Sequence, residues 1–181
     1  MISEDNIGKL KFPIGRFNYV ETNDPDIINS WIDDIEKLPS RLKSAVKDLT
    51  EEQLNTSYRE GGWTIKQVIH HIGDSHMNSY IRFKLALTED KPTIKAYNQT
   101  KWAELKEYEL TQVKDSLEFI ESFHKRLVLL LKSLSQADFE REFIHPETDS
   151  HVKLKRNLAL YAWHSNHHLA HITNLIKSKN W

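Results

Sequence analysis

Apolar residues recur along the chain at intervals of three and four, the spacing that places them on one face of an α-helix. Four long segments show this spacing, at about 25–49, 64–88, 111–134 and 154–177. The first begins at Asp24-Pro25, a favourable helix cap followed by proline at the first helical position. Pro39 lies within this segment, and we expect the helix to be interrupted there.

Alternation of apolar and polar residues, which would indicate β-strands, is not sustained anywhere in the sequence. The pattern therefore predicts an all-α fold, an up-down four-helix bundle with long connecting loops, formed by one domain of residues 1–181. The connections at 89–110 and 135–153 are longer than a bundle requires, so we expect them to line a site. Residues 1–25 are expected to be irregular, with a turn at 13–17, and the bundle core should include Trp31, Ile69, Ile72, Leu127, Leu158 and Ile172.

The composition narrows the function classes without selecting one. The 25 basic and 26 acidic side chains give a formal net charge of −1, which argues against nucleic acid or an anionic membrane as a partner. The absence of cysteine excludes disulfides, thiolate metal sites and cysteine nucleophiles. Without a signal-like or membrane-spanning stretch, we expect a cytoplasmic enzyme or binding protein.

Histidine is the unusual component, because seven of the ten histidines lie on two of the predicted helices. His164 and His168 are four residues apart, which places both imidazoles on one helical face, about 5–6 Å apart at Cβ. Such a pair can chelate a divalent ion, and one imidazole from another helix would complete a three-histidine site. The alternative interpretation is a polar, solvated helix face. The seven residues are His70, His71, His76, His164, His167, His168 and His171.

The helical positions of these residues indicate which of them face a site. His164, His168 and His171 lie beside the apolar face of the last helix, whereas His167 is predicted to point towards solvent. On the second helix we expect Lys66 and His70 to be exposed. Four other polar residues lie on the same face of this helix as His71, namely Asp74, Ser75, Asn78 and Arg82. This mixture of one acid, small polar groups and one arginine is typical of a cleft wall, whereas a solvated surface usually carries Lys and Glu.

Two groups of candidate residues follow from this pattern. Asn78 and Arg82 are candidates for binding an anionic group of a small-molecule substrate, although a surface salt bridge is an equal alternative for Arg82. The candidate proton-transfer groups are Asp74, His76 and His171.

Two segments carry a resemblance to a known family. Residues 61–76 read GGWTIKQVIHHIGDSH and residues 163–172 read WHSNHHLAHI. Together with residues 12–17 and 77–82, they resemble the DinB-like superfamily of four-helix metal proteins, and most closely its YfiT-type branch of metal-dependent hydrolases. The resemblance covers almost the whole chain. It implies that His71, His164 and His168 bind a divalent metal, usually zinc with nickel as the alternative, and that the protein is a homodimer.

Three functions are compatible with such a site. Three neutral imidazoles leave an ion its full charge and an open coordination position, as in catalytic zinc centres, and the Irving–Williams order favours Ni²⁺, Cu²⁺ or Zn²⁺. Such an ion can activate water, which predicts a metal-dependent hydrolase. It can equally hold a thiolate, and relatives of this branch include thiol S-transferases that use low-molecular-weight thiols such as bacillithiol. A non-catalytic metal-binding stress protein is the third alternative. Ser165 argues against a zinc protease, because the HExxH motif has Glu at that position.

Overall fold

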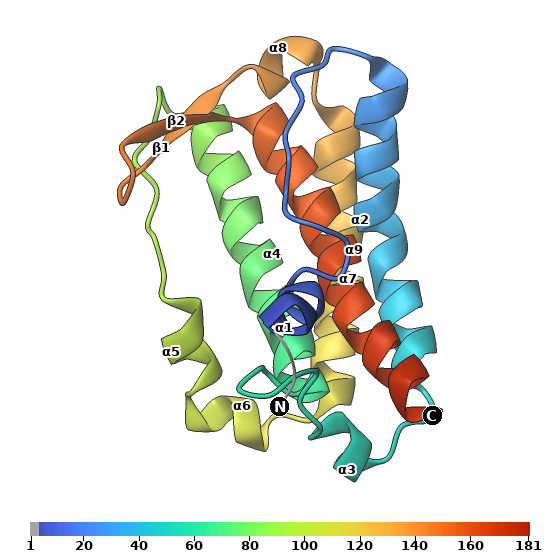
Figure 1. Ribbon diagram of the computed structural model, residues 1–181. Helices are drawn as coiled ribbons and strands as arrows, with labels where there is room; N and C mark the ends of the chain where they lie inside the picture. The colour runs from blue at the N-terminus through green and yellow to red at the C-terminus, as the bar shows by residue number, and fades with distance from the viewer. Residues whose placement is uncertain (1–3) are drawn as a thin grey trace.

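The computed structural model describes residues 4–181, in which four long helices pack side by side (Figure 1). They are α2 (Pro25–Val46), α4 (Ile65–Thr88), α7 (Val113–Ser133) and α9 (Leu154–Lys179). Every bound lies within three residues of the predicted one. The prediction of an all-α four-helix bundle is therefore confirmed.

Side-chain caps fix where two of these helices begin. The Asp24 carboxylate accepts a hydrogen bond from the backbone N–H of Asp26, and Pro25 occupies the first helical position. At the start of α4 the Thr64 hydroxyl accepts from the N–H of Gln67, while the Gln67 side chain accepts from the N–H of Thr64. Such caps satisfy backbone donors that have no partner within the helix. They set the residue at which α4 starts and hence the direction in which its histidines point.

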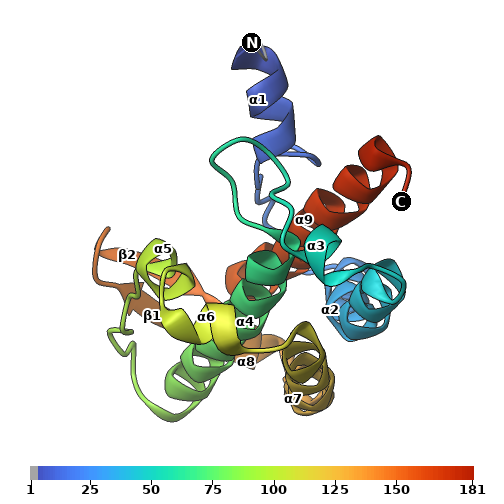
Figure 2. The same cartoon turned by 90° about the horizontal axis from the view of Figure 1, so that it is seen from below.

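The helices do not alternate in direction along the chain, so the predicted up-down order is wrong. α4 and α7 run parallel, because His70 contacts Ser116 near their starts and Tyr80 contacts Phe123 further along both. α2 and α9 both run the opposite way, which gives the order down, up, up, down (Figure 1). The chain must therefore return along the outside of α4, about 36 Å long at 1.5 Å per residue, before α7 begins. This return explains the length of the connection at 89–112, which lies beside α4 in Figure 2.

Short elements occupy the connections. β1 (Glu142–His145) and β2 (Ser150–Lys153) form an antiparallel hairpin in a segment that was predicted to be a loop, and these strands are too short to show alternation. The helix α1 (Glu4–Lys11) lies in a region predicted to be irregular. The turn at 13–17 is present, with Gly15 at a φ of 81°. The remaining short helices are α1 (Glu4–Lys11), α3 (Glu51–Leu54), α5 (Gln99–Ala103), α6 (Lys106–Leu110) and α8 (Gln136–Phe139).

Pro39 lies inside α2 without ending it, so the predicted interruption is wrong. Proline has no N–H, which deprives the Ile35 carbonyl of its helical donor. His124 of α7 supplies the missing bond, because its Nδ1–H donates to the Ile35 oxygen at 2.9 Å. Burial lowers the pKa of His124 to about 4, so the ring is neutral at pH 7. A side chain from a neighbouring helix thus allows α2 to continue past Pro39.

This arrangement predicts a specific coupling between the two residues. His124→Leu is expected to destabilise the protein by about 1–3 kcal/mol, because it leaves the buried Ile35 carbonyl without a donor. In a Pro39→Ala background the backbone N–H at position 39 can donate instead, so the same change should cost less than half as much. Urea unfolding of the four variants as a double-mutant cycle measures the coupling. Equal costs in both backgrounds would contradict it.

The hydrophobic core consists of two clusters with a layer of histidines between them. One cluster includes Leu127 and Leu158, and the other includes Ile69, Ile72 and Ile172. These five predicted core residues are at most 2% exposed, whereas the sixth, Trp31, is half-buried against the first cluster. Helices α4, α7 and α9 each place histidines between the clusters, so the bundle interior is polar at this level. The layer contains His71, His76, His124, His164 and His168.

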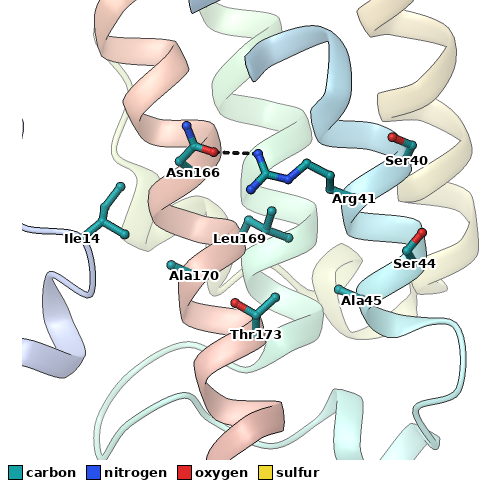
Figure 3. A pocket seen from close by; sticks show the side chains of 9 residues that line it. All are labelled: Ile14, Ser40, Arg41, Ser44, Ala45, Asn166, Leu169, Ala170 and Thr173. Carbon is teal, nitrogen blue, oxygen red and sulfur yellow. Dashed lines mark hydrogen bonds between the residues drawn. The ribbon is translucent and has the colours of Figure 1, made fainter. Parts of the chain in front are cut away.

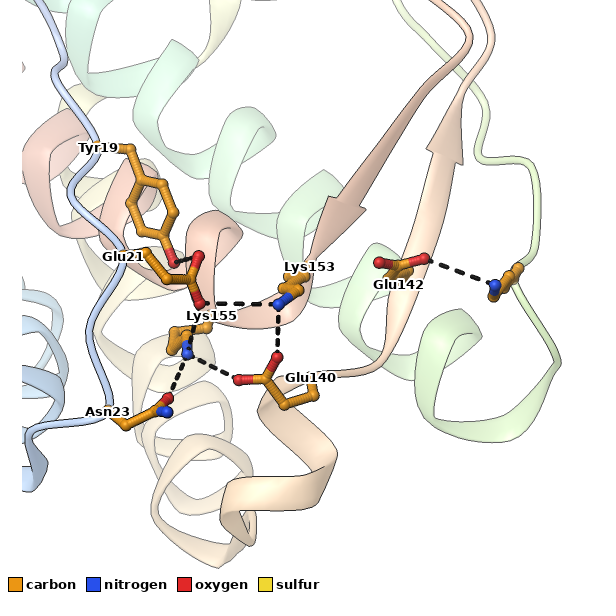
Figure 4. A network of polar contacts seen from close by, with 8 residues as sticks. Tyr19, Glu21, Asn23, Glu140, Glu142, Lys153 and Lys155 are labelled. Carbon is orange, nitrogen blue, oxygen red and sulfur yellow. Dashed lines mark hydrogen bonds and ion pairs between the residues drawn. The ribbon is translucent and has the colours of Figure 1, made fainter.

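A polar network fastens the segment before α2 to the end of the bundle where α9 begins (Figure 4). The Nζ of Lys155, a residue only 1% exposed, lies 2.7 Å from carboxylate oxygens of both Glu21 and Glu140. It also donates to the side-chain oxygen of Asn23. These bonds satisfy a buried ammonium group that would otherwise be costly. They hold the chain along α9 on its way from α1 to α2.

No helix in the described part of the chain is long and apolar enough to cross a bilayer. Three expectations stay predictions: a single domain over residues 1–181, a homodimer and a cytoplasmic location. Residues 1–3 of that domain lie outside the described part of the chain.

Candidate metal centre

Three imidazoles from two helices converge within the histidine layer. One ring nitrogen of each of His71, His164 and His168 lies within 4.8 Å of the other two. The Nε2 atoms of His71 and His164 are 3.2 Å apart. The structure thus brings together the three residues that the family resemblance indicated as ligands.

The charge and geometry of this group fit a divalent cation. At Zn–N distances of 2.0–2.1 Å, two nitrogens of a tetrahedral site lie about 3.3–3.4 Å apart, close to the spacing of His71 and His164. Burial lowers the pKa of His71 to about 3 and holds the pKa values of His164 and His168 well below their usual range. All three rings are neutral at pH 7 and have lone pairs available. Buried lone pairs without a donor are unfavourable, and a cation would satisfy them.

Two further histidines lie behind His168 and His164 and fix the tautomers of their rings. His171 Nε2 lies 3.3 Å from the backbone oxygen of Lys11, which can only accept, so this nitrogen carries the proton. His171 Nδ1 then accepts from His168 Nδ1 at 3.4 Å, which leaves Nε2 of His168 free for the ion. Likewise His76 Nε2 lies 3.2 Å from Nδ1 of His164, opposite the Nε2 that faces His71. Metal-binding histidines commonly have such a partner on the second ring nitrogen.

Asp74 occupies a different position from the other two candidate proton-transfer groups. His76 is completely buried and His171 nearly so, whereas Asp74 is half-buried. The Tyr108 hydroxyl of α6 donates to Asp74 Oδ2 at 2.5 Å. Burial raises the pKa of Asp74, although the bond from Tyr108 opposes this shift.

Three residues expected on exposed faces are buried. His167 stacks on Trp163 with ring centroids 4.3 Å apart, and Phe12 covers it. On α4, Lys66 donates to the Glu109 backbone oxygen, and His70 Nδ1 lies 2.6 Å from the Ser116 hydroxyl. The reason is that the segment after α1 covers this face of α9, and the α6–α7 region covers this face of α4. Helical periodicity does not show which faces a long connection will cover.

Asn78 and Arg82, the candidate substrate-binding residues, line a cavity of about 500 Å³. Its other wall comes from the connection after α4 and includes Tyr97 and Trp102, so part of this connection does line a cavity beside the site. Sequence reasoning missed Tyr97, which lies beside Ser75 and whose pKa burial raises to about 12. The signal that could have found it is an aromatic side chain in a connection expected to line a site.

A second cavity, of about 710 Å³, lies between α2 and α9 (Figure 3). Arg41 crosses it and donates to the Asn166 side-chain oxygen at 2.8 Å. None of the candidate site residues lines this cavity, so it is not part of the histidine centre.

Comparisons with known proteins identify relatives along most of the chain. The model of the DinB superfamily matches residues 34–172. A protein from Oceanobacillus iheyensis named "putative metal-dependent hydrolase" is 54% identical over 171 residues, which cover 94% of this chain and 98% of that protein. A protein with the same description from Bacillus mycoides is 55% identical over 172 residues, with coverage of 95% and 98%.

A solved structure matches the fold closely. YfiT from Bacillus subtilis, described as a probable metal-dependent hydrolase with an unusual four-helix bundle topology, has a TM-score of 0.93 to this chain. The two sequences are 44% identical, and the match covers 96% of this chain and 99% of that one.

Proposed function

Since the chain belongs to the DinB superfamily, and its relatives are named as metal-dependent hydrolases, we propose that it hydrolyses a small molecule with the help of a divalent metal ion. The observation that carries the proposal is the convergence of three neutral imidazoles on one point, two of them buried and that of His164 partly buried. His71, His164 and His168 would hold the ion, and we expect Zn²⁺ or Ni²⁺. When bound, such an ion supplies Lewis acidity and lowers the pKa of water.

His76 and His171 act as positioning residues in this proposal. Each lies against the far ring nitrogen of a ligand, so each keeps that ring in the orientation and tautomer that direct Nε2 to the ion. Neither needs to exchange a proton with substrate. Of the three candidates for proton transfer, we therefore retain Asp74 in that role.

Asp74 has the properties of a proton acceptor. Burial raises the pKa of its carboxyl group, and a general base works best when its pKa lies nearer the operating pH. Tyr108 holds one oxygen in place through its hydroxyl. In hydrolysis the carboxylate would take a proton from the attacking water and return it to the leaving group as the bond to the acyl carbon breaks.

A paired assay tests this function. Metal-loaded protein is given 4-nitrophenyl esters and anilides alone, and separately 1-chloro-2,4-dinitrobenzene with cysteine. We expect hydrolysis without thiol. Asp74→Asn should retain the metal content but lower kcat by about 10²–10⁴-fold, the usual contribution of a general base.

Other results would replace the proposal with one of its alternatives. Turnover only with the thiol would indicate S-transfer. No turnover of either kind by fully metal-loaded protein would indicate a metal-binding protein without catalysis.

A further inference from the structure

The cavity between α4 and the connection that follows it adjoins the proposed metal centre. Tyr97, in the wall of this cavity, lies beside Ser75. The Ser75 hydroxyl in turn lies 3.5 Å from Nε2 of His164, the ring nitrogen that faces His71. Only two side chains therefore separate this 500 Å³ cavity from the point where the imidazoles converge.

Arg82 is the residue of this cavity whose guanidinium group has no hydrogen-bond acceptor among the described residues, although it lies over the Phe143 ring, 6.0 Å from the centroid. Its Nε atom is buried and contacts no hydrogen-bond acceptor within the described part of the chain. Among the described side chains, no carboxylate forms an ion pair with its guanidinium group. A buried N–H donor of a partly buried cation is unfavourable without an acceptor, and an anionic ligand would supply one. The salt bridge considered for Arg82 from the sequence is therefore not formed with any described side chain.

The remaining wall is suited to an apolar body. The rings of Tyr97 and Trp102 lie 4.6 Å apart between centroids, and Ile94 beside them is only 3% exposed. Asn78 contributes a neutral amide, and Lys95 is exposed. One partly buried cation matches a single negative charge, which favours a carboxylate over a dianionic phosphate.

We propose that this cavity binds a small monocarboxylate with an aromatic or branched apolar body, whose carboxylate pairs with Arg82. The proposal rests on the proposed function only in taking this ligand as the substrate. Arg82 follows His71 by eleven residues, about 16 Å along α4, so a carboxylate paired with Arg82 lies well away from the proposed metal centre. The substrate class is therefore an elongated carboxylate, whose apolar body separates the charged group from the bond to be cleaved.

Calorimetric titration of two matched probes tests the binding site without requiring turnover. N-acetyl-L-phenylalanine and its primary amide differ only in the charged group, and both are titrated into metal-free protein. We expect the acid to bind at least tenfold more tightly than the amide. Arg82→Gln should abolish this preference, and Arg82→Lys should retain part of it. Arg126→Gln is the matched control, because Arg126 is exposed on α7 away from the cavity.

Equal binding of acid and amide to the metal-free protein would overturn the proposal. So would a preference that persists in both Arg82 variants, as judged on variants whose thermal unfolding is cooperative. A preference that appears only with metal present and is lost in His168→Ala would place the carboxylate on the ion instead. Failure of the hydrolysis assay with intact Arg82-dependent binding would reject the proposed function but leave this site in place.

Discussion

His164→Ala is expected to lower the affinity for Zn²⁺ by more than 10³-fold, because it removes one of only three ligands, whereas loss of a supporting residue typically costs 10–100-fold. Competition with a chromophoric chelator measures the affinity directly. Thermal unfolding gives a second readout: a ligand at a thousand times its Kd stabilises a protein by about 4 kcal/mol. In a domain of this size that raises Tm by roughly 8–16 °C. The wild-type protein should show this shift with zinc, and the variant should show none.

Two controls separate the ligand from its surroundings. His76→Phe removes only the group behind His164, so zinc affinity should fall by an intermediate 10–100-fold. His151→Ala changes a half-exposed imidazole of β2 and should bind zinc like the wild-type protein. Unchanged zinc binding in His164→Ala, or an equal loss in His151→Ala, would contradict the assignment.

The long helices could be predicted because their information is local. Apolar spacing and the caps at Asp24 and Thr64 depend on residues close in the sequence, and the bounds of α2 and α4 follow from them. The i, i+4 spacing of His164 and His168 likewise guarantees a shared face once α9 forms. The spacing of residues did not select His71 as the third candidate ligand, which only the family resemblance indicated, because that choice requires knowing which face of α4 meets α9.

The features that were missed depend on contacts between distant segments. His167 was expected in solvent, but Phe12, far away in the sequence, covers it. Pro39 was expected to interrupt α2, but His124 of another helix replaces the lost hydrogen bond. Tyr97 becomes part of the site only because the connection after α4 returns along that helix. In each case the deciding contact is tertiary, and no local pattern in one sequence reports it.

Acid is expected to unfold the metal-free protein with a midpoint near pH 5. Burial lowers the pKa of His71 to about 3 and the pKa values of His124, His167 and His171 to about 4. For His71 and His171, neighbouring imidazoles lower the pKa further. The same groups titrate near pH 6.5 in the unfolded chain. Between pH 6.5 and 4 the unfolded state therefore binds protons that the folded state does not. Stability is complete above pH 6.5 and falls as the pH is lowered through this window.

The size of this effect depends on how steeply the free energy of unfolding changes with pH. Each such histidine contributes up to about 1.4 kcal/mol per pH unit, so four contribute up to about 5 kcal/mol per unit. A domain with a total stability of roughly 5–15 kcal/mol cannot withstand that slope for more than one to three units. Urea unfolding at pH 5.5, 6.5 and 7.5 in the presence of a chelator measures it. His167→Asn removes one of the four groups and should reduce the slope of stability against pH by about a quarter. Equal stability of the wild-type protein at all three pH values would show that the buried imidazoles do not titrate as the structure requires.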